Sequence, residues 1–163
     1  MSVIPSISIA QVEQEISDCL AYCKRFGWEI SEIDKIQLKF TVRMVSPVDN
    51  EVFVLEVGFI DYNQLPLILD FIEPGTGTKG SLKACPKYEG DTFFHQNGLI
   101  CSPCSRRAYK VFNDLNGPHT DWTMSGWQTN PQVGSLTSIP AILLAIHSRI
   151  VDKLNYKGPM EKR

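Results

Sequence analysis

Apolar residues change their spacing between residues 26 and 36. Before this point they recur three or four positions apart, as in a helix with one buried face: Val12, Ile16, Cys19, Leu20, Cys23 and Phe26. Ser8 and Gln11 have the spacing of a capping box, so we expect the helix to begin at Ser8 and to end at Gly27. After residue 35 the period becomes two, with apolar residues at alternate positions: Ile36, Leu38, Phe40, Val42 and Met44. This second pattern predicts a strand with one face on a core.

Two further strands are expected, over residues 51–60 and 65–72. The connection of residues 46–50 is short, so the first two strands should pair antiparallel. Residues 73–92 read as a loop. Their Gly-x-Gly-x-x-Gly spacing at residues 75–80 is not followed by a helical pattern, which a dinucleotide site would need.

The last third of the chain predicts helices. Apolar positions in residues 105–115 have helical spacing, and Asn-Gly-Pro at residues 116–118 is a stop signal. A final helix should begin at Ser138, with Pro140 in its first turn, before a polar tail at residues 157–163. The expected class is therefore α+β, with an N-terminal helix, an antiparallel meander sheet of three to four strands and C-terminal helices.

Composition narrows the function classes. A chain of 163 residues with 43% hydrophobic and 21% charged residues fits one globular domain over residues 1–163. The net charge of −2 and the lack of basic blocks argue against binding nucleic acid or membranes. We see no signal peptide and expect a cytoplasmic protein. Five cysteines cannot all pair within the chain, so we expect reduced thiols.

Residues 93–104 concentrate the candidate chemistry, and one interpretation is a zinc site. Four residues supply the number and type of ligands that a tetrahedral site needs: Cys85, His95, Cys101 and Cys104. However, only one Cys-x-x-Cys pair is present, whereas zinc motifs usually have two close pairs.

The other interpretation makes Cys101 a nucleophile on a loop, following the turn signal at Gly98. Arg106 and Arg107 could stabilise its thiolate, and Asn97 or backbone N–H groups could stabilise an oxyanion. His119 and His147 are possible bases, although nothing singles either of them out, and the position of His147 on the flank of the final helix favours a structural role over that of a base. From local chemistry alone, a small buried cysteine is the competing explanation.

The order of motifs resembles the ubiquitin-conjugating enzyme family, in its divergent prokaryotic branch. His95-Gln96-Asn97 is similar to the family's His-Pro-Asn element, and residues 98–101 are similar to its Gly-x-Ile-Cys nucleophile. Residues 52–62 resemble its second strand and Asp-Tyr corner, and residues 135–146 its Leu-Leu-x-Ile helix. The chain departs from the pattern at Gln96, in the short spacing from Asn97 to Cys101, and in an enlarged segment at 102–134.

The resemblance implies an enzyme. Cys101 would carry a ubiquitin-like protein as a thioester and pass it to an amine, with a ubiquitin-activating-like enzyme and a protein target as partners. Asn97 would be the oxyanion donor or only a turn residue, and His95 would hold the loop through hydrogen bonds. No cofactor or metal is expected, and related bacterial systems imply a role in anti-phage defence. The alternatives are a non-catalytic protein-interaction module of the same fold and the zinc-stapled domain.

Overall fold

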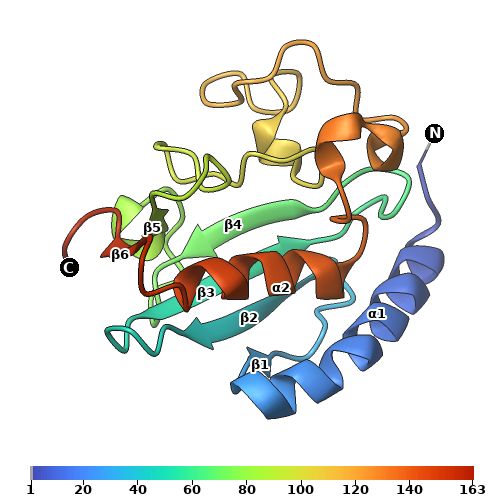
Figure 1. The fold of residues 1–163 in the computed structure, drawn as a ribbon. Coiled ribbons are helices and arrows are strands. Elements are labelled where there is room, and N and C mark those ends of the chain that lie inside the picture. Colours follow the sequence, from blue (N-terminus) through green and yellow to red (C-terminus); the bar gives the residue numbers. More distant parts are fainter. Residues whose placement is uncertain (1) are drawn as a thin grey trace.

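The computed structural model describes residues 2–163 and has an α+β architecture with two helices packed on one face of an antiparallel sheet (Figure 1). The helices are α1 (Pro5–Phe26) and α2 (Ile139–Ile150). The sheet contains, in spatial order, β1 (Glu29–Ile30), β2 (Lys39–Val45), β3 (Val52–Gly58) and β4 (Ile68–Ile72). A second sheet pairs β5 (Pro86–Tyr88) with β6 (Tyr156–Pro159). Residues 2–163 also contain four short 3₁₀ helices: η1 (Leu82–Ala84), η2 (Arg106–Ala108), η3 (Trp127–Thr129) and η4 (Pro131–Val133).

Helix α1 begins earlier than the sequence predicts. Pro5 occupies its first turn, where a missing N–H costs nothing, and Ile4 is the N-cap. Ser8 lies inside the helix, fully buried, and its hydroxyl donates to the Tyr62 carbonyl at 2.6 Å. The capping box at Ser8 is therefore wrong, because this tertiary hydrogen bond takes the hydroxyl. The end at Gly27 is confirmed, since its φ of +74° is the left-handed conformation that glycine adopts without strain.

The alternating pattern correctly predicts one buried face on β2 and β3. Val42 pairs with Leu55 in an antiparallel register, and both side chains belong to the core. Strand β2 starts at Lys39, whereas the alternating pattern predicts a start at Ile36, which is 94% exposed. Leu38 has a φ of +53°, a conformation outside the β region, so the strand cannot extend through it.

The predicted helix at 105–115 is wrong beyond η2. Val111 and Leu115 are exposed, and the backbone N–H of Lys110 donates to the His119 carbonyl instead of to a helical partner. Two other expectations change together. Part of the predicted loop at 73–92 forms β5, and the predicted polar tail forms β6, because these segments supply each other's backbone partners.

The last helix is confirmed as α2, with Ser138 as its cap, and it is the one α-helix among the described residues after β4. Glu15 of α1 stabilises the first turn of α2. This buried carboxylate accepts from the backbone N–H of Ile139 and from the Tyr62 hydroxyl, each at 2.9 Å. Burial raises the pKa of Tyr62, so its hydroxyl remains a donor. No helix within residues 2–163 is long and apolar enough to span a membrane.

Candidate functional site

Residues 93–101 form a tight hairpin, here called the cysteine hairpin. The N–H of Cys101 donates to the Phe93 carbonyl and that of His95 to the Leu99 carbonyl, both at 2.8 Å. The turn requires Gly98, which has a φ of +90°. A Cβ there would also lie 2.8 Å from the Cys85 sulfur. The turn predicted from Asn-Gly is confirmed, and it brings Cys101 back beside the start of the hairpin.

Residues 109–119 form a loop, here called the strap, whose two ends pair with each other. The N–H of His119 donates to the Ala108 carbonyl at 3.1 Å, and that of Lys110 donates to the His119 carbonyl at 2.9 Å. Gly117 sits against the strap's own backbone, where a Cβ would approach the Tyr109 carbonyl oxygen to 2.5 Å. Tyr109 is fully buried beneath and donates its hydroxyl to the Pro103 carbonyl. These bonds fix where the strap returns.

The strap brings His119 to Cys101. The Cys101 sulfur lies 3.1 Å from Nε2 of His119, within hydrogen-bond reach for a sulfur. The imidazole stacks on the Trp122 indole, with ring centroids 3.4 Å apart and planes 3° apart. Trp122 belongs to a small apolar cluster, the strap cluster: Leu99, Ala108, Tyr109 and Trp122. The ring of His119 is thereby held in one orientation toward the thiol.

Burial favours the neutral form of both groups in the pair. Burial raises the pKa of the Cys101 thiol. Burial also lowers the pKa of His119, with a further lowering from His95 and an opposing contribution from Asp121. A neutral thiol can donate to an unprotonated Nε2, so His119 is ready to accept a proton when the sulfur attacks an electrophile. Cys101 is partly exposed, as such an attack requires.

Asn97 and His95, the other two predicted site residues, contact each other. Oδ1 of Asn97 is 2.8 Å from Nδ1 of His95 and also accepts from the Leu99 N–H at 3.4 Å. The Nδ2 group of Asn97 donates to the Asn116 carbonyl of the strap at 3.0 Å. The side chain of Asn97 thus contacts the turn on one side and the strap on the other.

The expectation that two arginines stabilise the thiolate is wrong. Arg106 is buried and donates to the carbonyls of Pro66 and Ile60. Arg107 forms a bidentate pair with Asp70 of β4, with both N–O distances at 2.9 Å. Both guanidinium groups are thus engaged by partners on the sheet and on the loop after β3, and neither contributes to the pKa shift of Cys101.

The placement of the predicted ligands argues against the zinc alternative. Cys85 and Cys104 are both buried thiols. Cys101 contacts His119 rather than the His95 of the proposed ligand set. Among residues 2–163, no group of three or more His, Cys, Asp or Glu side chains is placed to hold a metal ion.

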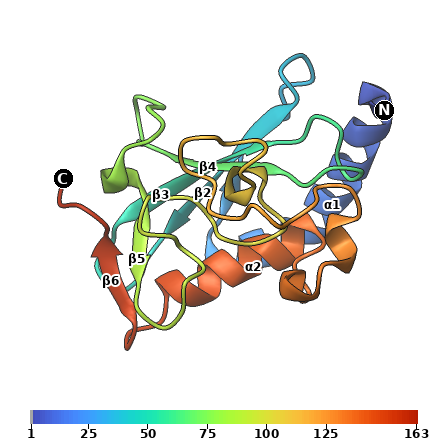
Figure 2. The same cartoon turned by 90° about the horizontal axis from the view of Figure 1, so that it is seen from above.

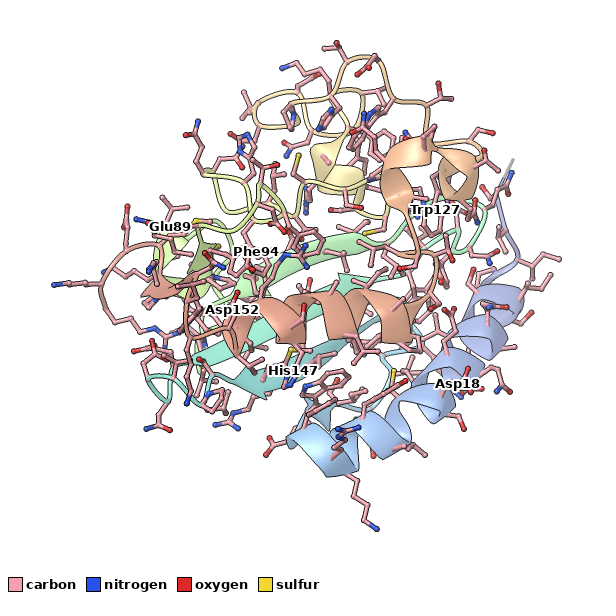
Figure 3. The ribbon with its side chains drawn as sticks, viewed as in Figure 1. Asp18, Glu89, Phe94, Trp127, His147 and Asp152 are labelled. Atoms are coloured by element: carbon pink, nitrogen blue, oxygen red, sulfur yellow. The ribbon has the colours of Figure 1, made fainter. Side chains whose placement is uncertain are left out.

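His147, the other candidate base, lies elsewhere. Figure 3 shows it on the side of α2 that faces α1, away from the loops that carry the site. Its ring is 4.2 Å from that of Phe26, and its Nδ1 accepts from the Trp28 indole at 3.0 Å. The structural role expected for His147 agrees with these contacts, whereas His119 is brought to Cys101 by the return of the strap. Figure 1 shows the loops that carry the site beyond the β4 edge of the sheet, and Figure 2 views the molecule from the side of these loops.

The chain was compared with protein-family models and with curated proteins. No match was found in either. The resemblance to conjugating enzymes therefore remains a prediction from motif order.

Proposed function

We propose that this protein is a ubiquitin-conjugating-like transferase that carries a ubiquitin-like protein as a thioester on Cys101 and passes it to an amine. The observation that carries the proposal is the 3.1 Å contact between the Cys101 sulfur and Nε2 of His119. A partly exposed thiol with an imidazole at this distance suits nucleophilic attack on a carbonyl. The order of α1, the meander sheet and α2 around it agrees with what the motif resemblance leads us to expect.

The reaction needs only proton transfer and acyl exchange. The Cys101 sulfur attacks the carbonyl carbon of a thioester on the activating enzyme, and its proton moves to Nε2 of His119. A new C–S bond forms, the old one breaks, and the leaving thiolate takes the proton from His119. An amine of the target then attacks the new thioester, forming an amide and returning Cys101 to the thiol.

The partners in this proposal are a ubiquitin-like protein, its activating enzyme and a target protein. Neither step consumes a cofactor in this chain, because the acyl group arrives already activated as a thioester. The family resemblance suggests a bacterial pathway of anti-phage defence, in which this protein acts together with the ubiquitin-like protein and the activating enzyme.

Reconstitution with an activating enzyme, a ubiquitin-like protein and ATP tests the proposal. The wild-type chain should form an adduct that reducing agents remove, because a thioester is cleaved by thiols. Cys101→Ala should abolish the adduct. Cys23→Ala, which removes another partly exposed thiol on α1, should leave it intact. An adduct that persists in Cys101→Ala would overturn the assignment of Cys101.

A protein-interaction module with the same architecture is the second candidate. It is favoured by the burial that raises the pKa of Cys101 and keeps the thiol neutral. A wild-type chain that binds a ubiquitin-like protein reversibly, and forms no adduct under the same conditions, would favour the module over the transferase.

A further inference from the structure

We infer that Asn97 is a positioning residue that acts on Cys101 through the strap and His119, and not a donor to the reacting acyl group. For its place in a reaction the inference rests on the proposed function. Its geometric content, that Asn97 keeps His119 beside Cys101, can be tested without any acyl carrier.

The amide of Asn97 has a fixed orientation. The backbone N–H of Leu99 can only donate and the carbonyl of Asn116 can only accept, so the end of the amide that faces Leu99 is Oδ1. The opposite end is then the NH₂ group, and it donates to the Asn116 carbonyl at 3.0 Å. The donor that an oxyanion would need is therefore already directed at the strap.

The position of Asn116 matters because the chain between it and His119 is stiff. Gly117 is packed against the carbonyl of Tyr109, which leaves no room for a Cβ. Pro118 has a φ fixed by its ring. His119 itself is held by backbone hydrogen bonds to Ala108 and Lys110. A shift of Asn116 is consequently passed on to His119.

The cysteine hairpin and the strap are thus joined by two polar contacts. One links Asn97 to Asn116, and the other links Cys101 to His119. Asn116 precedes His119 by three residues on the strap, and Asn97 precedes Cys101 by four residues on the hairpin. Without the first contact, the strap would still be held by its own turn and its paired ends, and His119 by its stacking on Trp122, but no side-chain bond from Asn97 would fix the strap against the cysteine hairpin.

Alkylation of Cys101 by iodoacetamide separates the two roles of Asn97. The thiolate displaces iodide at a saturated carbon, so no oxyanion forms and an oxyanion donor has no effect on the rate. A base beside the thiol does affect it. We measure the rate specifically at Cys101 by mass spectrometry between pH 6 and pH 10, with Asn97→Ala, Asn97→Asp, His119→Ala and the corresponding double variants.

At neutral pH, His119→Ala should slow alkylation by about 10- to 100-fold, as loss of a general base does. Each Asn97 variant should slow it by about tenfold, because a misplaced base loses much of its effect. In the His119→Ala background the Asn97 substitutions should add less than about twofold, since both act through one unit. All differences should shrink as the pH rises, because hydroxide then deprotonates an increasing fraction of Cys101 without help from His119.

Gln96→Ala is the matched control, because Gln96 is exposed and adjacent in the same turn. It should alkylate at the wild-type rate. Three results would overturn the inference: Asn97 variants that alkylate normally, Asn97 effects that persist undiminished in the His119→Ala background, or no effect of His119→Ala. The alkylation pattern expected here, together with a wild-type chain that forms no thioester, would support the positioning role and reject the proposed transferase instead.

Discussion

The molecule buries its apolar side chains in two clusters that are held together in different ways. The main cluster lies between the helices and the sheet, where ladders of backbone hydrogen bonds fix every strand. The strap cluster has four buried residues, and its chain is held mainly by turns and by side chains that bond to carbonyls, such as Tyr109 to Pro103.

This difference has a consequence for the site. A small cluster under a loop opens at a lower free energy than a core of paired strands. Cys101 packs at the edge of the strap cluster, and His119 stacks on one of its members. The reactive pair is therefore placed where the structure can open locally while the main cluster stays folded.

The largest effect is expected in the main cluster. Phe40→Ala should lower the free energy of unfolding by about 3–5 kcal/mol, because it leaves a cavity under the sheet. Phe40 is only 2% exposed. Urea denaturation measures this, and Ile36→Ala at an exposed site should change stability by less than about 0.5 kcal/mol. Equal effects of both substitutions would contradict the assignment of the core.

An intermediate effect is expected in the strap cluster. Trp122→Ala should cost less stability than Phe40→Ala, about 1–3 kcal/mol, since the loop can collapse around the gap. It should nevertheless speed hydrogen exchange at the amides of Lys110 and His119, which pair the ends of the strap. If the clusters are independent, combining Trp122→Ala with Phe40→Ala should give additive losses within about 0.5 kcal/mol. Strong coupling would show that the strap is part of the main core.

The main cluster is held by paired strands and the strap cluster by turns and side-chain bonds, and this difference decides how well the sequence predicts each region. Alternation over Phe40, Val42 and Met44 correctly predicts β2, because a paired strand must bury every second residue. The helical spacing of Val111 and Leu115 is misleading, since the strap is fixed by partners distant in sequence. No local pattern reports such partners.

The same limit applies to the candidate site. The cysteine hairpin could be predicted from its Asn-Gly turn. The preference for Cys101 over Cys104 agrees with the burial of Cys104. The pairing of Cys101 with His119 could not be predicted, because it depends on a loop closing over 18 residues.

The smallest effect is expected at the rim of the main cluster, at Asp152. The Asn155 amide and then the Tyr88 hydroxyl hold the pKa of this exposed carboxyl at about 2. Because the folded-state pKa is lowered, the contribution to stability is present above the ordinary pKa of an aspartate. It is lost as the pH falls toward 2. Tyr88→Phe should raise the pKa of Asp152, as measured by NMR titration, with almost no change in stability at pH 7. If the pKa of Asp152 is unchanged in Tyr88→Phe, the Tyr88 hydroxyl is not a cause of the lowered pKa.

The burial of Cys104 also determines how the protein responds to oxidants. Cys101 and Cys104 have the spacing of a redox pair, but Cys104 is 0% exposed and its raised pKa leaves almost no thiolate. A sulfenic acid formed on Cys101 would therefore not be resolved by Cys104 into an intrachain disulfide. Its recovery would depend on small thiols from solution, and prolonged peroxide exposure would carry Cys101 onward to the irreversible sulfinic state.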